Sequence, residues 1–357
     1  MAYMQGPFLP RLIAFELTGS CNLKCVHCRA SAANQRDPKE LSTQEIKGVI
    51  DDITSFSNPI MILTGGEPLL RDDLYEIAKH ATDNGLRVVL GTNGTLINDE
   101  VAEKLIGVGV KRVSISIDCA YAEEHDEFRG VAGAYKKALR GIKACNKAGL
   151  EFQVNTTVTR RNLAELEKIH SLTIELGAVA HHIFLLVPTG RGKAIEDEEI
   201  PPEEYERVLN WMYDVKDKGV YMKATCAPHF VRIIHKRAKE EGEDLPRRKY
   251  GMEAMMGGCM GGTTFAFISR RGDVNPCGYL PLKAGNIRGK SFREIWGSAK
   301  LFLDLRNRGA LKGKCGACEY KVACGGCRAR AYAKYKDYME EEPYCVYTPL
   351  KSAGKEL

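Results

Sequence analysis

The chain has 357 residues, is 44% hydrophobic and 27% charged, and carries a formal net charge of +6 at pH 7. This length suits one large domain with a smaller one, and the composition is ordinary for a soluble globular protein. No apolar run is long enough to span a membrane, and the N-terminus lacks the basic region and apolar core of a secretion signal, so we expect a cytoplasmic protein. The chain also lacks a long basic run with interleaved aromatic residues, which argues against a nucleic-acid partner.

Strand-like and helical segments alternate through the first half of the chain, which predicts βαβ units and a parallel sheet. The expected strands are Leu12–Leu17, Ile60–Leu63, Arg87–Leu90, Arg112–Ile117, Glu151–Thr157 and His181–Val187. The expected helices are Thr43–Ser55, Leu74–Asn84, Asp99–Ile106, Ala134–Ala148 and Leu163–Leu176. Right-handed crossovers wind such a sheet toward a barrel, and six units are too few to close an eight-stranded one. We therefore expect an α/β fold, a partial (β/α)6 barrel whose ligands bind at the carboxyl ends of the strands.

The first predicted strand leads into three closely spaced cysteines, Cys21, Cys25 and Cys28, in the pattern C-x3-C-x2-C. The chain has thirteen cysteines, and without an export signal metal binding explains them better than disulfides. Three thiolates on one loop can hold three irons of a [4Fe–4S] cluster and leave the fourth iron open for a reactant. A zinc site, with His27 as a further ligand, is the alternative, but structural zinc usually takes paired cysteine hooks and four ligands.

A second motif, Gly65-Gly66-Glu67-Pro68, ends the second predicted strand. Glycines let the backbone approach a ligand closely, and a carboxylate can accept hydrogen bonds from an ammonium group. Together, the cysteine triplet and this motif resemble the radical SAM superfamily. The resemblance implies that S-adenosylmethionine (SAM) chelates the open iron, that its reductive cleavage gives a 5′-deoxyadenosyl radical, and that the glycine motif holds the methionine amine. It also implies that His27 packs against the nucleoside.

Polar residues near the next strand ends are candidates for further SAM contacts. We select Ser116 for the ribose hydroxyls, with Asn93 and Asp118 as further candidates. Arg129 matches an arginine that SPASM-type members of the superfamily use on the SAM carboxylate; a surface salt bridge is the alternative. Asn155 is expected to face the same ligand.

Beyond the barrel, a helix is expected near Pro202–Asp217, followed by a charged stretch at Lys236–Lys249 that reads as an exposed connector or a lid. Cysteine and glycine then become more frequent, so we place a domain boundary near residue 225. The barrel would span 1–225 and a cysteine-rich domain 226–349, with a mobile tail at 350–357.

Seven cysteines in the C-terminal part follow the order C-x12-G-x4-C, C-x2-C-x5-C-x2-C and C, and this order resembles the SPASM extension with its two auxiliary iron–sulfur clusters. The resemblance implies an outer cluster held by Cys315, Cys318, Cys324 and Cys345. It implies an inner cluster held by Cys259, Cys277 and Cys327. A zinc ribbon is the alternative for the central group.

The inner set lacks an obvious fourth cysteine, because Met260-Gly261-Gly262 stands where one is usual. The inner cluster would then have an open iron or a ligand from elsewhere. Cys226 is the natural candidate, with His229 close by; packing is the alternative role for both. Cys119 and Cys145 fall in a strand end and an apolar helix face, so we expect core thiols there.

Five stretches resemble tetrapyrrole-acting radical SAM enzymes, and most closely the haem b synthases of the sirohaem-dependent pathway. They are residues 11–18, 181–193, 223–229, 278–280 and 285–288. The resemblance implies oxidative decarboxylation of two propionates of iron-coproporphyrin III to vinyl groups. It also implies a low-potential electron donor and an electron acceptor, with an auxiliary cluster as a plausible first acceptor.

A substrate with four carboxylates needs cations in its cavity, and Arg191, Lys193 and Arg288 are candidates. His181, His182 and His229 are candidate ligands to the porphyrin iron. Three alternatives stay open: a sister tetrapyrrole enzyme, a peptide maturase, and a non-enzymatic electron carrier. The glycine motif disfavours the carrier, which has no use for a SAM clamp.

Overall fold

The computed structural model describes residues 8–216, 218–242 and 258–350. Seven strands pair in chain order, all parallel, and form the body of one curved sheet. They are β1 (Leu12–Glu16), β2 (Ile60–Thr64), β3 (Val88–Thr92), β4 (Arg112–Ser116), β5 (Phe152–Val158), β6 (Ala180–Leu185) and β7 (Tyr221–Thr225). The predicted parallel α/β sheet is confirmed, with β7 as a further strand that the sequence analysis did not predict.

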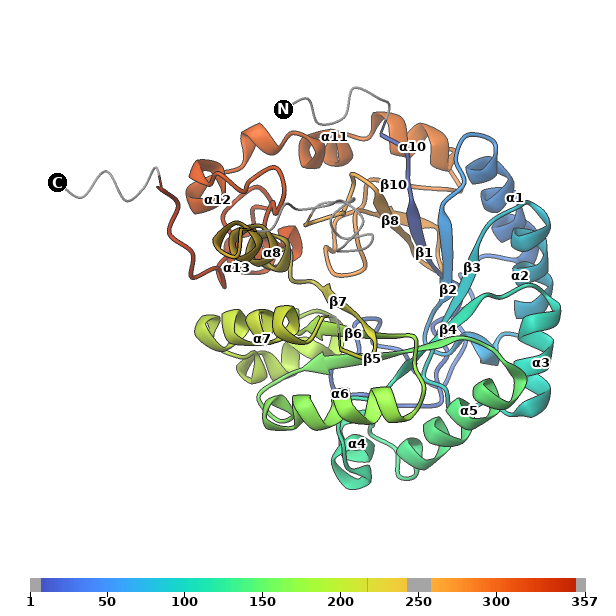
Figure 1. The fold of residues 1–357 in the computed structure, drawn as a ribbon. Helices are drawn as coiled ribbons and strands as arrows, with labels where there is room; N and C mark the ends of the chain where they lie inside the picture. Colours follow the sequence, from blue (N-terminus) through green and yellow to red (C-terminus); the bar gives the residue numbers. More distant parts are fainter. Residues whose placement is uncertain (1–7, 217, 243–257, 351–357) are drawn as a thin grey trace.

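Helices join these strands and cover the outside of the sheet, as Figure 1 shows. They are α1 (Thr43–Thr54), α2 (Leu74–Asp83), α3 (Asp99–Gly107), α4 (Ala122–Arg129), α5 (Ala134–Ala148), α6 (Leu166–Glu175) and α7 (Pro202–Val215). Local sequence sets their ends: Ser42 caps α1 by accepting from the Glu45 N–H, while the Glu45 carboxylate accepts from the Ser42 N–H. The short, polar helix α4 was not predicted.

Strand alternation divides the sheet into an apolar outer face and a polar inner face. Along β4, Val113 and Ile115 belong to the core shared with the helices. Ser114 and Ser116 alternate with them and therefore face the interior. The same alternation places Asn155 and His182 on the inner face, because they are the register partners of Ser116 and Asn155 respectively.

The C-terminal part of the chain extends the same sheet beyond β1. Strand β8 (Phe265–Ile268) pairs parallel with β1, followed by antiparallel β9 (Asp273–Asn275) and β10 (Gly285–Asn286). Five further helices complete the described fold: α8 (His229–Glu240), α10 (Phe292–Ser298), α11 (Lys300–Arg306), α12 (Gly313–Ala317) and α13 (Arg328–Tyr335). In Figure 1, the segment from α10 to α13 runs across the top of the view, between α1 and α8.

The charged stretch predicted as a connector begins inside α8, which ends at Glu240. Residues 243–249 of that stretch and most of the predicted mobile tail lie outside the described residues. Within the described ranges, no helix is both long and apolar enough to cross a membrane.

Candidate functional site

The three cysteines of the N-terminal motif lie on the loop that follows β1. Cys21 and Cys25 are buried and Cys28 is half-buried, packed with Leu23 and Ala32. Backbone N–H groups point at two of the sulfurs: Leu23 donates to Cys21 Sγ at 3.4 Å, and Ala32 donates to Cys28 Sγ at 3.5 Å. Burial raises the pKa of the Cys21 thiol to about 11, so a bound cation is needed to hold it as a thiolate.

The two glycines of the second motif let β2 end directly against the cysteine loop. Gly66 N donates to Thr18 O at 2.8 Å, and Glu67 N donates to Ser20 O at 2.7 Å. A Cβ atom on Gly66 would lie 2.2 Å from Ser20 O, closer than any side chain permits. The glycines thus serve a backbone-to-backbone approach, where the sequence analysis expected a backbone-to-ligand approach.

Glu67 is fully buried beside this contact, and Pro68 follows it at the start of a short 3-10 helix. Its carboxylate accepts from Thr92 Oγ1 at 2.8 Å, Asn93 N at 2.8 Å and Leu69 N at 3.1 Å. Burial raises the pKa of Glu67 to about 7, and the three donors oppose that shift. A cation placed beside Glu67 would favour its charged form.

Asn93 links the end of β3 to the cysteine loop. Its side-chain amide donates to Asn22 Oδ1 at 2.9 Å and points at Cys21 Sγ, 3.9 Å away. Its oxygen accepts from Thr95. In the described structure Asn93 therefore supports the loop, whereas the sequence suggested a ribose contact.

Asp118 and Arg129 form a buried ion pair with each other. Burial raises the pKa of Asp118, and the Arg129 guanidinium opposes that shift. Arg129 Nη1 also points at Cys25 Sγ at 3.7 Å. The surface salt bridge considered for Arg129 is wrong, since the side chain is 8% exposed.

The outer cysteines Cys315, Cys318, Cys324 and Cys345 line one cavity together with His229, Arg232 and Glu342. Both ring nitrogens of His229 are buried without a hydrogen-bond partner. Burial, and then the charge of Arg330, holds the pKa of His229 well below its usual value, so the ring is neutral. His229 therefore lies beside the outer cysteines. The sequence suggested two roles for it, a ligand near the inner cluster and a ligand to the porphyrin iron.

The inner cysteines Cys226, Cys259, Cys277 and Cys327 lie near one another. Burial raises the pKa of Cys226 well above its usual value, and the charges of Cys327, Cys277 and Cys259 raise it further. Cys226 adopts the left-handed backbone conformation (φ 61°), which is rare for a residue with a side chain. Its carbonyl accepts from Tyr205 Oη at 2.8 Å and Arg330 Nη1 at 3.1 Å, and these buried donors hold it there.

Glu342, which the sequence analysis missed, connects the inner and outer cysteine sets. Its buried carboxylate accepts from Cys327 N at 2.7 Å, and its own N–H points at Cys315 Sγ at 3.3 Å. Arg330 lies 3.6 Å from the same carboxylate. No pattern in the sequence distinguishes this glutamate from its neighbours Glu340 and Glu341.

In the part of the chain that the structure describes, no three His, Cys, Asp or Glu side chains converge closely enough to hold a single metal ion. A four-iron cluster spreads its thiolate ligands more widely than one ion does. Apart from the open fourth position of two sets, all the predicted ligands are cysteines, and thiolates are the ligands that [4Fe–4S] clusters take.

The predicted substrate cations lie in different surroundings. Arg191 donates to Cys25 O at 2.9 Å and Ala32 O at 2.6 Å, so it clasps the cysteine loop. Arg288 pairs with Glu45 at 2.6 Å on α1. Lys193 is exposed. These contacts give no support to Arg191 or Arg288 as carboxylate ligands of a substrate.

The two predicted histidines of β6 face opposite ways because successive strand residues alternate. His181 packs outward on His170, with the rings 5.5 Å apart, and is fully buried. This placement contradicts the expectation that His181 reaches a porphyrin iron. His182 faces the interior, where its Nδ1 lies 2.8 Å from Gln153 Nε2.

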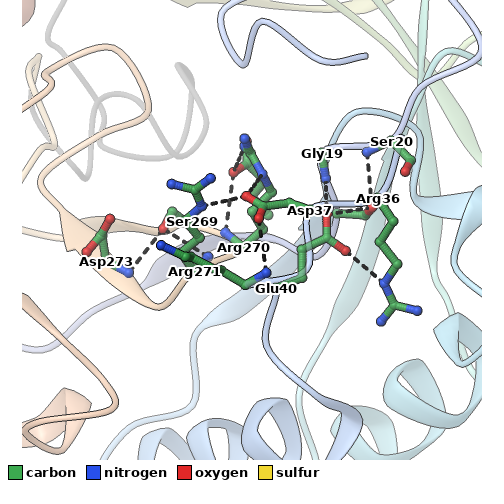
Figure 2. A network of polar contacts seen from close by, with 12 residues as sticks. Gly19, Ser20, Arg36, Asp37, Glu40, Ser269, Arg270, Arg271 and Asp273 are labelled. Atoms are coloured by element: carbon green, nitrogen blue, oxygen red, sulfur yellow. Dashed lines mark hydrogen bonds and ion pairs between the residues drawn. The ribbon is translucent and has the colours of Figure 1, made fainter. Parts of the chain in front are cut away.

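A polar network ties the cysteine loop to the turn between β8 and β9. Figure 2 shows Arg271 donating to Asp37, and Gly19 N and Arg36 donating to Glu40. The Glu40 carboxylate lies 2.6 Å from Gly19 N and 3.1 Å from Arg36 Nε. Arg270 pairs with Glu16 at 2.9 Å. The C-terminal part of the chain therefore helps to fix the loop that carries Cys21, Cys25 and Cys28.

Two sequence profiles match the chain: the Radical SAM superfamily over residues 15–173, and the iron-sulfur cluster-binding SPASM domain over residues 259–319. The AdoMet-dependent heme synthases of Methanosarcina barkeri and Nitratidesulfovibrio vulgaris are 56% and 53% identical, over 96% of this chain and 98% and 93% of theirs. The Fe-coproporphyrin III synthase of Methanosarcina barkeri is 32% identical, over 94% of this chain and 88% of its own.

Solved structures show the same fold at low sequence identity. Streptococcus suis SuiB bound to S-adenosylmethionine has a TM-score of 0.72 at 18% identity, covering 95% of this chain and 78% of its own. The anSMEcpe structure with bound AdoMet has a TM-score of 0.67 at 20% identity, covering 94% of each chain. The Radical SAM match confirms the expected SAM and [4Fe–4S] cluster, and the SPASM match confirms that further iron–sulfur clusters are bound. The chain therefore belongs to the radical SAM enzymes with a SPASM domain and, within them, to the family of the AdoMet-dependent heme synthases.

Proposed function

We propose that this enzyme converts iron-coproporphyrin III to haem by oxidative decarboxylation of two propionate side chains to vinyl groups. The observation that carries the proposal is that this chain is far more identical in sequence to heme synthases than to relatives with other names. Three heme synthases are 53–56% identical over 96% of the chain. A pre-heme d1 synthase and a mycofactocin maturase reach only 31% and 32% over the same share.

Under this proposal, Cys21, Cys25 and Cys28 hold the radical SAM cluster. Glu67 accepts from the methionine amine, because a buried carboxylate with a raised pKa gains most from a cation. Arg129 binds the SAM carboxylate while Asp118 keeps the guanidinium in position. Ser116 and Asn155, which are register partners, face the ribose, and Asn93 holds the loop.

When bound, the cluster and SAM supply a radical that removes a hydrogen atom from the β-carbon of a propionate. Loss of CO2 from that substrate radical releases one electron, so the reaction needs an electron acceptor as well as a low-potential donor. We propose that Cys315, Cys318, Cys324 and Cys345 hold one auxiliary cluster. We propose that Cys259, Cys277 and Cys327 hold another, with Cys226 as fourth ligand. Glu342 and Arg330 keep the two sets in a fixed relation.

Three other functions are weaker candidates. A sister tetrapyrrole enzyme would act on other side chains, and a peptide maturase would act on a small precursor. The similarity to SuiB is below 25% identity and supports the fold alone. A protein whose clusters only transfer electrons would bring no cation to the buried Glu67 carboxylate, whose pKa is raised to about 7.

The test is an anaerobic assay of reconstituted protein with SAM, a low-potential reductant and iron-coproporphyrin III, read by mass spectrometry. Stepwise loss of two carboxyl groups together with 5′-deoxyadenosine supports the proposal. If 5′-deoxyadenosine forms but the porphyrin stays intact, the substrate assignment fails. The variant with Cys21, Cys25 and Cys28 all changed to Ala is the control: it should cleave no SAM yet keep its C-terminal iron.

A further inference from the structure

A row of polar residues crosses the inner face of the sheet at one level. Ser116 on β4, Asn155 on β5, His182 on β6 and Lys223 on β7 are successive register partners. Neighbouring strands lie about 4.8 Å apart, so the row spans about 14 Å from Ser116 to Lys223. That length is comparable with the width of a coproporphyrin, whose carboxylates project from its rim.

Lys223 ends this row as a cation with no hydrogen-bond or ion-pair partner among the described residues. It is half-buried, so its charge is neither fully solvated nor compensated. Two other cations, Arg29 and Arg191, are already engaged: Arg29 pairs with Glu16 at 3.0 Å, and Arg191 donates to backbone carbonyls. A half-buried, unpaired ammonium group is suited to an anionic ligand.

His182 presents an N–H group to the interior. The Gln153 amide donates both to Asn155 Oδ1 at 2.9 Å and to His182 Nδ1 at 2.8 Å. A neutral imidazole that accepts at Nδ1 carries its proton at Nε2. Burial, and then the charge of Lys223, holds the pKa of His182 well below its usual value, so the ring stays neutral. His182 Nε2 therefore lacks the lone pair that an iron ligand requires.

We propose that the Lys223 ammonium group and the His182 Nε2–H form an anion subsite that holds one propionate carboxylate of the substrate. A charged donor beside a neutral donor binds a carboxylate through two charge-assisted hydrogen bonds. Because Ser116 lies at the SAM end of the row, the held propionate is not the reacting one, and it orients the ring so that another propionate reaches the SAM side. This inference rests on the proposed function. It assigns His182 to carboxylate binding, whereas the sequence suggested that His182 is a ligand to the porphyrin iron.

The test is equilibrium binding of iron-coproporphyrin III to the reconstituted, SAM-loaded enzyme under anaerobic conditions. Lys223→Met should raise the dissociation constant by about tenfold to a hundredfold. Lys223→Arg keeps the positive charge and should restore part of the lost affinity. His182→Leu should raise it by about tenfold with an unchanged Soret band, because no iron ligand is lost. Lys136→Met on the exposed side of α5 removes the same charge elsewhere and should bind as wild type does. Iron content and circular dichroism check that each variant is folded and loaded.

The possible failures are distinguishable. Wild-type affinity in a folded Lys223→Met variant overturns the subsite while the decarboxylation assay stands. A shifted Soret band in His182→Leu shows iron ligation and overturns the donor role. If the wild-type enzyme neither binds nor decarboxylates iron-coproporphyrin III, the proposed function fails, and the subsite fails with it.

Discussion

At the scale of single residues, Gly66 determines how closely the glycine motif Gly65–Pro68 approaches the cysteine loop. In Gly66→Ala, the new Cβ would meet Ser20 O at 2.2 Å and Cys21 Cβ at 3.0 Å. The nearest contact is with backbone, so the loop must shift. We expect loss of the N-terminal cluster and of SAM cleavage, while the C-terminal iron remains. Iron content together with 5′-deoxyadenosine formation measures both.

Gly48→Ala is the matched control, because Gly48 lies on the exposed side of α1 with nothing within 4 Å of an added Cβ. It should leave SAM cleavage unchanged and stabilise the helix by about 0.5–1 kcal/mol. Full SAM cleavage by Gly66→Ala would show that the close approach is unnecessary.

His181 makes the folded state sensitive to acid. Thr156 Oγ1 donates to Ile117 O at 2.6 Å, so it must accept from His181 Nε2 at 2.9 Å. His181 Nδ1 then accepts from His170 Nδ1 at 3.2 Å. Burial, and then His170, lowers the pKa of His181 to about 3. Protonation would set two donors against each other at the contact between the rings.

A histidine whose folded pKa is lowered contributes stability above its unfolded pKa, near 6.5, and loses it as the pH falls toward 3. From pH 7.5 to 5.5 this corresponds to about 1.4 kcal/mol of unfolding free energy. His181→Gln keeps a hydrogen-bond donor and an acceptor but does not titrate. Between pH 7.5 and 5.5, its unfolding free energy should therefore fall by about 1.4 kcal/mol less than that of the wild type. Urea unfolding at the two pH values measures the difference. Equal losses in the two proteins would refute the role of His181.

The sequence alone could have separated the two histidines of β6, since residues 181 and 182 must face opposite sides of a strand. The N-terminal cysteine triplet and the glycine motif could be predicted because each is a short local pattern. The inner cysteine set runs from Cys226 to Cys327, so it could be grouped only through its resemblance to the SPASM pattern. The roles of Arg191 and Glu342 were not, because their partners lie far away in the chain; Arg191 and Cys25 are 166 positions apart.

At the scale of elements, the short helical segment Gly190–Glu198 clasps the cysteine loop. Gly190 has φ 57°, and a Cβ there would lie 2.2 Å from Arg29 O. Arg191 donates hydrogen bonds to carbonyls of the loop from both its backbone N–H and its guanidinium. The segment therefore holds the second half of the loop, residues 25–32, whereas the glycine motif contacts residues 18–21.

Arg191→Lys should loosen this clasp, because a single ammonium group cannot match the planar guanidinium that reaches two carbonyls. We expect lower occupancy of the N-terminal cluster and slower SAM cleavage, because the loop should be destabilised by about 1–3 kcal/mol. Porphyrin affinity per loaded protein should stay unchanged. Iron analysis, SAM cleavage and porphyrin binding measure the three quantities.

Glu196→Gln is the control on the same segment, since Glu196 is exposed, and it should keep its iron. If Arg191→Lys keeps full iron content but binds iron-coproporphyrin III more weakly, then Arg191 acts on the substrate, as its sequence context suggested.

Two elements could not be predicted from the sequence, and each has a physical reason. Helix α4 carries little apolar surface, and Phe128 is its one large apolar buried residue. Strand β8 has four residues and pairs with β1 across roughly 250 residues, so no local pattern reveals the pairing. By contrast, α1, α2 and α5 were predictable because each places its apolar residues at helical spacing.

At the scale of the whole molecule, one sheet and the largest hydrophobic core cluster run through both parts of the chain. The core cluster under α1 and α2 includes residues of the C-terminal part, among them Ile268, Phe292, Trp296 and Phe302. Trp296 also donates to Phe8 O at 2.8 Å. The predicted boundary near residue 225 therefore separates the two groups of sequence motifs, but it does not separate two hydrophobic cores.

A chain cut after residue 225 should consequently not fold alone. It would lose β8 from the edge of β1, together with Phe292, Trp296 and Phe302 from the core. Fully burying side chains of this size is worth about 1.5–3 kcal/mol each, so the loss approaches a typical total stability of about 5–15 kcal/mol. We expect the fragment to be insoluble or to lack cooperative unfolding by circular dichroism, and Trp296→Ala in the full chain to cost about 3–5 kcal/mol. A fragment that unfolds cooperatively and holds its iron would show instead that the barrel is an independent domain.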